Sequence, residues 1–141
     1  MKILIMGLPG SGKTSLAALL NSILPNCIWY NADAVRRKYN DWDFSEEGRR
    51  RQACRMKDLA DASLTNYVKY VICDFVAPTE EIRDIFNADY IIWMDTIHRG
   101  RFEDTNKIFI PPNKYNIRVT EQQAKSWADI IIEDINNINN K

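Results

Sequence analysis

Several features that mark particular protein classes are absent from this sequence of 141 residues. No stretch approaches the ~20 apolar residues of a membrane-spanning helix, and the N-terminus lacks the basic segment and apolar run of a secretory leader. Basic and acidic residues balance at nineteen each. The total charge therefore gives no reason to expect a nucleic-acid or membrane partner, although it leaves local charged patches open. We therefore expect a soluble cytoplasmic protein.

Cysteine and histidine are also scarce. The three cysteines are odd in number and lack the spacing of a metal site, and Cys27 and Cys73 fall in segments that are typical of strands. We interpret the cysteines as reduced core residues, neither metal ligands nor nucleophiles. The single histidine, His98, has no neighbour in the sequence with which to form a catalytic dyad, so we expect it at the surface.

Glycine is infrequent, but three of the five glycines lie in the segment GLPGSGKT. This is the pattern of a phosphate-binding loop (Walker A), in which backbone N–H groups face phosphate oxygens, the lysine reaches the terminal phosphates and the threonine hydroxyl can ligate Mg²⁺. A short apolar run precedes it and a helical pattern follows, so a helix N-terminus would face the anion. A purely structural turn has no use for Gly-Lys-Thr in that order. We expect the nucleotide to be bound by Gly7, Leu8, Pro9, Gly10, Ser11, Gly12, Lys13, Thr14 and Ser15.

Strand-like and helix-like segments alternate along the chain. Strands are expected at residues 2–6, 27–31, 69–75, 89–95 and 115–119, and helices at about 15–24, 45–67, 79–86 and after Thr120. Residues 120–123 form a capping box ahead of the last helix. The alternation predicts an α/β fold of the P-loop NTPase type, a three-layer α/β/α sandwich around a mostly parallel five-stranded sheet. Residues 1–141 would form one domain.

Two carboxylates stand at predicted strand ends, where ligands gather in parallel sheets. Phosphoryl transfer needs Mg²⁺ and a group that orients or deprotonates the acceptor hydroxyl. We assign the second task to Asp33, and we expect Thr14 and Asp74 to hold the metal, Asp74 through water. The alternative for each aspartate is a helix N-cap.

Four motifs in order, GLPGSGKT, NADAVR, DFSEEGRRRQACR and FVAP, resemble those of the adenylylsulfate kinases. These enzymes phosphorylate the 3′-hydroxyl of adenylylsulfate with ATP, and typically carry GLSGSGKS/T, DGDN-[IV]-R, GFS-x-x-DR-x-x-N-x-RR and FISP. The resemblance covers roughly residues 1–83 and implies an ATP- and Mg²⁺-dependent kinase with a small nucleotide-like acceptor. The sequence is compatible with a homodimer.

The resemblance also implies roles for single residues. Asp33 matches an aspartate that activates the acceptor hydroxyl, and Arg36 matches an arginine that holds the phosphate-sulfate region. Phe44 matches the aromatic residue that stacks on the adenine of the acceptor. Arg49 and Gln52 match residues that contact the acceptor, and their spacing of three places them on one helix face.

The remaining matches lie in the same motifs. Arg55 matches the second arginine of the RR pair, whereas Arg50 and Arg51 are expected on a solvated helix flank. The FISP motif, whose backbone lines the acceptor pocket, is matched by Phe75, Val76, Ala77 and Pro78.

The sequence departs from the family around the acceptor. Asn31, Ala32 and Ala34 replace three residues of DGDN, Gly48 replaces the aspartate of DR-x-x-N, Cys54 replaces the first arginine of the RR pair, and Asp74 stands where the family has a small polar residue. One interpretation is that Asp74 replaces, across the site, the carboxylate that is missing at Asn31.

Residues 96–112 replace the long lid of the family with TIHRGRFEDTNKIFIPP. We expect a mobile segment over the nucleotide, in which Arg99 and Arg101 neutralise charge on the transferred phosphoryl group and Lys107 is a third candidate. Phe102 or Phe109 would supply the missing aromatic residue. The alternatives are ordinary loop charges, and a phenylalanine that anchors the loop in the core.

The sequence thus favours an ATP-dependent kinase for a hydroxyl of a small nucleotide-like acceptor, with adenylylsulfate first. The alternatives are another acceptor, namely a nucleoside, a nucleotide-linked metabolite or a nucleic-acid end, or a non-catalytic nucleotide-binding module.

Overall fold

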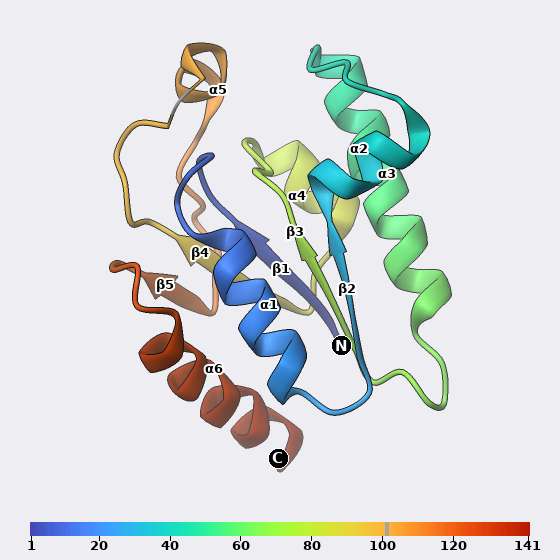
Figure 1. The fold of residues 1–141 in the computed structure, drawn as a ribbon, viewed down its shortest axis with the longest axis vertical. Coiled ribbons are helices and arrows are strands. Elements are labelled where there is room, and N and C mark those ends of the chain that lie inside the picture. Colours follow the sequence, from blue (N-terminus) through green and yellow to red (C-terminus); the bar gives the residue numbers. More distant parts are fainter. Residues whose placement is uncertain (101) are drawn as a thin grey trace.

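The computed structural model describes residues 1–100 and 102–141 (Figure 1). Within these residues, five strands form one sheet in the order β2-β3-β1-β4-β5, and every neighbouring pair is parallel. The strands are β1 (Lys2–Met6), β2 (Cys27–Asn31), β3 (Tyr70–Asp74), β4 (Tyr90–Met94) and β5 (Ile117–Val119). The predicted α/β fold is confirmed, with a sheet that is parallel throughout.

Helices cover both faces of the sheet. On one face, the buried side chains of α1 (Lys13–Ile23) and α6 (Ala124–Asn139) pack together with residues of the sheet. The other face is covered by α2 (Ala32–Tyr39), α3 (Glu46–Ser63) and α4 (Glu80–Phe86). A further helix, α5 (Glu103–Ile108), lies beyond the sheet at the end opposite to the chain termini.

The central strands explain why the sheet needs cover on both faces. β1 and β3 are buried along their whole length. In β1, Ile3 and Ile5 pack on the α1/α6 side, whereas Leu4 and Met6 pack on the other side, as the alternation of side chains along a strand requires. A strand enclosed in this way is largely apolar; here the charged residues Lys2 and Asp74 stand at the ends of the strands, and both central strands end at the edge that carries the phosphate-binding loop.

The predicted capping box before α6 is wrong. The helix begins at Ala124, its N-cap is Gln123, and this cap has no side-chain hydrogen bond. Residues 120–123 instead form a turn in which the Gln122 amide donates to the Gly10 carbonyl oxygen at 3.1 Å. The helices α2 and α5 were also not among the predicted elements.

Among the described residues, no helix is both long enough and apolar enough to cross a membrane.

Candidate active site

The phosphate-binding loop joins β1 to α1. Gly7, Gly10 and Gly12 have φ values of 151°, 88° and 99°, a backbone region that residues with a side chain rarely adopt. At Gly7 the reason is also steric, because a Cβ atom would lie 2.6 Å from the Met94 carbonyl oxygen at the end of β4. The glycines therefore let the loop pass close to the sheet edge before α1 begins.

Lys13, the first residue of α1, folds back over this loop. Its Nζ donates to the carbonyl oxygens of Gly7 at 2.9 Å and Leu8 at 3.0 Å. The ammonium group thus lies beside the backbone that would surround a phosphate, and its positive charge also favours the ionised form of Asp74.

Two residues that the sequence did not single out brace the loop. The Thr96 hydroxyl donates to the Ser11 carbonyl oxygen at 2.7 Å, and Gln122 Nε2 lies 3.3 Å from Thr96 Oγ1 as well as bonding Gly10. Both lie far from the loop in sequence, so no local pattern could have identified them.

Asp74 lies beside the loop at the end of β3. The residue is only 2% exposed. Its carboxylate accepts hydrogen bonds from Trp29 Nε1 and Asn31 Nδ2, both at 2.8 Å. Asn31 Nδ2 is also 3.4 Å from Thr14 Oγ1. Burial raises the pKa of Asp74 to about 6, although these hydrogen bonds and Lys13 favour the charged form. The structure therefore joins Thr14, Asn31 and Asp74 in one polar cluster.

Neither aspartate acts as a helix N-cap. Asn31 caps α2, because its side chain accepts from the Ala34 N–H at 3.0 Å, and Thr79 caps α4. Asp33 instead is exposed in the first turn of α2, two residues after Asn31, which is the last residue of β2. Its carboxylate is therefore not used to begin a helix.

Arg36 and Phe44 stack on one another beside the chain that joins α2 to α3. Arg36 is only 4% exposed, and its Nη1 donates to the carbonyl oxygens of Asp41 at 3.0 Å and Asp43 at 3.2 Å. The Phe44 ring lies 4.2 Å from Arg36 Cζ and is half exposed. Burial is the main cause that lowers the pKa of Arg36. This arginine holds the chain between α2 and α3.

Helix α3 presents the other arginines. Arg49 is half-buried and lies close enough to Arg36 to lower its pKa. Arg50 pairs with Glu46 and Glu81 on the outer flank, as expected. Arg51 is paired with Asp41, and its side chain is 40% exposed, so it also lies on a solvated flank, as expected.

Gln52 holds the start of α2 in place. Gln52 is 3% exposed, and its Nε2 donates to the Ala32 carbonyl oxygen at the start of α2, at 3.0 Å.

The segment that follows β3 accepts two main-chain hydrogen bonds. The Gly7 N–H donates to the Val76 carbonyl oxygen, and the Ile110 N–H donates to that of Pro78. In the same segment Phe75 is buried and Ala77 has a φ of 47°. The segment thus links the phosphate-binding loop to the lid.

The lid segment, residues 96–112, carries α5. Arg99 pairs with Glu103 in this structure, and Arg101 lies outside the described residues. Phe109 packs against the core and Arg83, which favours the anchoring alternative for this ring. The side chains of Phe102, Lys107 and His98 are exposed.

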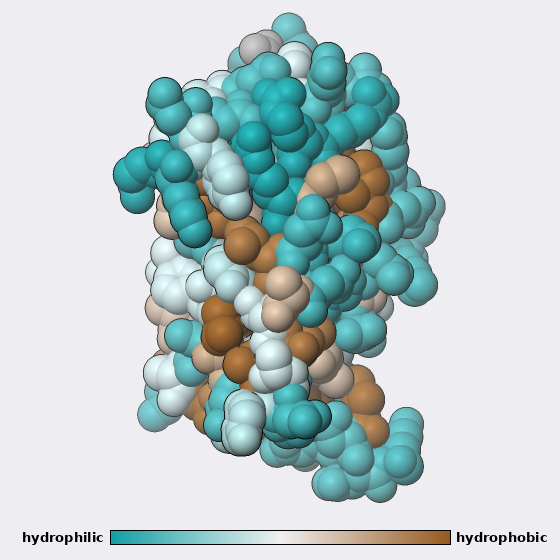
Figure 2. Space-filling model, turned by 90° about the vertical axis from the view of Figure 1, so that its right-hand side faces the viewer, coloured by the Kyte–Doolittle hydropathy of each residue, from teal (hydrophilic) through white to brown (hydrophobic). Residues whose placement is uncertain are grey.

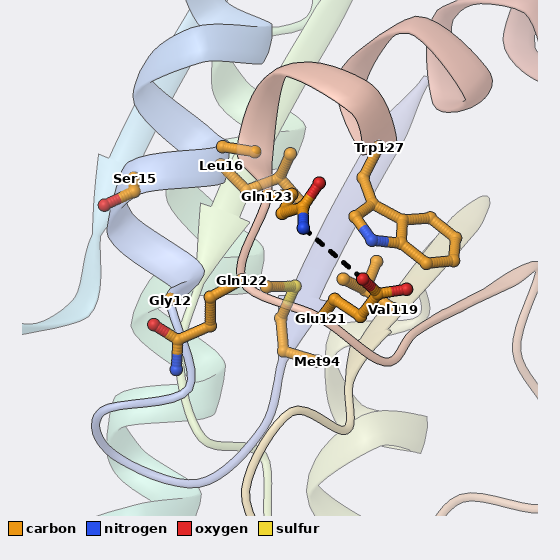
Figure 3. Close-up of a pocket in the computed structure, with 10 residues that line it drawn as sticks. Gly12, Ser15, Leu16, Met94, Val119, Glu121, Gln122, Gln123 and Trp127 are labelled. Atoms are coloured by element: carbon orange, nitrogen blue, oxygen red, sulfur yellow. Dashed lines mark hydrogen bonds between the residues drawn. The ribbon is translucent and has the colours of Figure 1, made fainter.

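A hollow opens next to the phosphate-binding loop, between the start of α1 and the turn before α6 (Figure 3). Gly12 and Gln122 lie on one side of it and Trp127 and Glu121 on the other, with Met94 between them. It combines an aromatic ring, aliphatic surface and amide groups, which suits a planar heterocycle.

The family model for adenylylsulphate kinase matches residues 1–93. The chain belongs to the adenylylsulphate kinase family. Comparison with curated protein sequences finds no matching relative. Family membership and fold together support a P-loop kinase and a phosphotransferase activity, and leave the acceptor open.

Solved structures share the fold at low identity. The Mycobacterium tuberculosis APS kinase, in complex with AMPPNP and APS, is 19% identical with a TM-score of 0.78, over 94% of this chain and 95% of that one. Shikimate kinase from Aquifex aeolicus is 20% identical with a TM-score of 0.67, over 99% and 98%. A sugar kinase from Janibacter is 15% identical with a TM-score of 0.69, over 94% and 92%. The shared fold thus accompanies several acceptors.

Two of the departures from the family motifs, at Asn31 with Asp74 and at Gly48, have structural reasons. Asn31 and Asp74 are register partners on neighbouring strands, so the carboxylate at Asp74 lies directly beside the position where the family motif has its own. At Gly48, a Cβ atom would lie 2.2 Å from the Asp43 carbonyl oxygen. Only glycine fits there, because the chain between α2 and α3 lies directly against α3.

Proposed function

We propose that the protein is an ATP-dependent kinase that transfers the γ-phosphoryl group to a hydroxyl of a small nucleotide-like acceptor. Adenylylsulfate, through its 3′-hydroxyl, is the acceptor that the family indicates first. The observation that carries the proposal is the cluster of Lys13, Thr14 and Asp74 around a glycine loop at the carboxyl edge of a parallel sheet. Phosphoryl transfer needs this arrangement of backbone donors, a cation and a carboxylate.

The residues present fit a magnesium ion. Asp74 is a buried carboxylate that accepts hydrogen bonds from the neutral N–H donors of Trp29 and Asn31, and burial raises its pKa. Thr14 and Asp74 would hold Mg²⁺, Asp74 through water. When bound, Mg²⁺ neutralises charge on the β- and γ-phosphate oxygens.

The side chains and backbone of the protein would bind the phosphates and the base of ATP. Lys13 would exchange the carbonyl oxygens of Gly7 and Leu8 for the terminal phosphates of ATP, and the loop N–H groups would hold the other phosphate oxygens. The hollow that Trp127 and Gln122 line would receive the base of ATP, since it adjoins Gly12 at the same loop.

The acceptor would bind on the opposite side of the loop, over α2 and α3. Asp33, exposed at the start of α2, would orient or deprotonate the acceptor hydroxyl. Arg49 would bind an anionic group of the acceptor, because a guanidinium binds such oxygens in a forked geometry. The lid arginine Arg99 would need to leave Glu103 before it could reach the transferred phosphoryl group.

The test is identification of the product. The protein is incubated with ATP and Mg²⁺ and, in separate reactions, with adenylylsulfate, adenosine and shikimate, and each acceptor is examined by mass spectrometry. We expect one added phosphoryl group on a hydroxyl acceptor, lost in Asp33→Asn. Hydrolysis of ATP without transfer to any acceptor would favour the nucleotide-binding module instead.

A further inference from the structure

The loop between α2 and α3, residues 40–45, carries two aspartates into the arginines of the acceptor side. We call these residues the acidic loop. Figure 2 views the molecule from the α3 side, where hydrophilic side chains dominate the upper part that Figure 1 assigns to this loop. Two of these arginines, Arg51 and Arg55, are paired with Asp41 of the loop in the protein without an acceptor.

Asp41 makes the main contacts. Arg51 donates to it with Nε at 2.7 Å and with Nη2 at 3.1 Å, one bond to each carboxylate oxygen. Arg55 donates to the same carboxylate from Nη1 at 2.6 Å. The Asp41 side chain is only 12% exposed, and the two arginines hold its pKa well below the usual range. Asp41 thus occupies the fork of Arg51 as an oxyanion would.

Asp43 adds a weaker contact of the same kind. Its Oδ2 accepts from Arg51 Nη2 at 3.2 Å, and its side chain is more exposed than that of Asp41. Its Oδ1 accepts from the Ser45 N–H at 2.9 Å, at the N-cap of α3. Asp43 therefore contributes to the shape of the loop as well as to its charge.

The sequence builds the acidic loop into this position. The buried guanidinium of Arg36 holds its main chain through two carbonyl oxygens, and Phe44 covers that guanidinium. Gly48 gives the loop room, since any Cβ there would overlap Asp43. Three separate features thus favour the same loop conformation.

An arginine pair of this kind is otherwise well suited to an anionic group of an acceptor. A phosphate or sulfate that approaches Arg51 and Arg55 has to displace the Asp41 carboxylate or bind beside its negative charge. A neutral acceptor meets no such competition. The acidic loop should therefore affect how tightly acceptors of different charge bind, and should not affect recognition of their hydroxyl groups.

We propose that Asp41 is a specificity-determining residue, whose carboxylate occupies the oxyanion position on Arg51 and Arg55 and limits the negative charge that an acceptor can carry there. The proposal rests on the proposed function for the location of the acceptor side. It predicts that loss of the Asp41 charge increases the preference of the protein for a phosphorylated acceptor over its neutral counterpart.

The test uses adenosine and adenosine 5′-phosphate, which share the same 2′- and 3′-hydroxyls and differ in charge. Their dissociation constants are measured by calorimetry on protein saturated with Mg²⁺ and a non-hydrolysable ATP analogue. The ratio of the two constants in the wild type is the reference for the variants. Asp41→Asn should bind adenosine 5′-phosphate about tenfold more tightly, the scale of one charge-assisted hydrogen bond, and adenosine unchanged.

Two further variants complete the design. Glu46→Gln removes the same charge in the first turn of α3, where the carboxylate pairs with Arg50, and should leave both constants unchanged. Asp43→Asn should tighten binding of the anion by about two- to threefold, because its contact with Arg51 is longer and more exposed. If Asp41→Asn does not fold, Asp43→Asn still tests whether removal of a negative charge from the acidic loop tightens binding of the anion.

Three outcomes would overturn the proposal. They are an unchanged ratio of the two constants in Asp41→Asn, weaker binding of the anion in both loop variants, and binding of neither ligand to any of the proteins. The test does not depend on turnover. If the charge effect is found but no acceptor is phosphorylated, the proposed function fails while the assignment of Asp41 stands.

Discussion

Substitution of Asp74 by asparagine should make the protein more stable at neutral pH and less dependent on pH. Asp74 is enclosed at the end of β3, and burial raises its pKa from an ordinary 3.8 to about 6. This difference corresponds to about 3 kcal/mol that the folded state loses when the carboxyl group ionises. The asparagine variant has no charge to bury and avoids this cost.

The sign follows from proton binding. Between pH 3.8 and about 6 the folded state holds a proton on Asp74 that the unfolded state has released. The stabilisation is therefore complete below pH 3.8 and is lost as the pH rises through 6. Between pH 4.5 and 7.5, the free energy of unfolding of the wild type should fall by about 2 kcal/mol relative to Asp74→Asn.

The assay is urea denaturation of both proteins at several pH values, without nucleotide. Asp41→Asn is the control of opposite sign. In the wild type the pKa of Asp41 is lowered, so its carboxylate stabilises the fold at pH values above its ordinary pKa, and this contribution is lost as the pH falls. Addition of Mg²⁺ and ADP should stabilise the wild type more than Asp74→Asn, since a nearby cation favours the ionised carboxylate. A free energy of unfolding of the wild type that stays constant relative to Asp74→Asn, or that increases relative to it as the pH rises, would refute the reasoning.

Three substitutions test other parts of the structure. Gly48→Ala should reduce the free energy of unfolding by on the order of 1–3 kcal/mol, because its Cβ would overlap Asp43; unchanged stability in denaturation would contradict the packing. Asp33→Asn should lower kcat about 10²–10⁴-fold with ATP affinity intact, and recovery with added Mg²⁺ would move this residue to the metal. Arg49→Ala should raise the KM for the acceptor about ten- to a hundredfold, whereas a change in the KM for ATP would place it on the nucleotide side.

Local sequence patterns were sufficient for the sheet and the phosphate-binding loop. The apolar runs KILIM and YVICD became strands β1 and β3, and the glycine loop between β1 and α1 has the backbone geometry that its pattern indicates. The proximity of Asp74 to Asn31 also followed from sequence, because parallel strands place their carboxyl ends at one edge.

Contacts between distant segments were not predictable in this way. The pairing of Arg51 with Asp41 depends on the path of the chain between two helices, and α2, which begins that path, has no strong apolar pattern. The same limit explains the wrong capping box. Residues 120–123 have the local signature of a cap, but α6 begins only at Ala124, so Thr120 lies three residues before the N-cap, and the Gln122 side chain instead holds Gly10 in the phosphate-binding loop.

Transfer of a labelled γ-phosphoryl group from ATP to a hydroxyl acceptor, measured in parallel for the wild type and Lys13→Ala, tests the central claim most directly. Because Lys13 acts through its charge at the surface of the loop, the variant should keep the wild-type melting temperature and lose transfer. The account predicts labelled acceptor with the wild type alone. Equal transfer by Lys13→Ala, or no labelled acceptor with either protein, would contradict it.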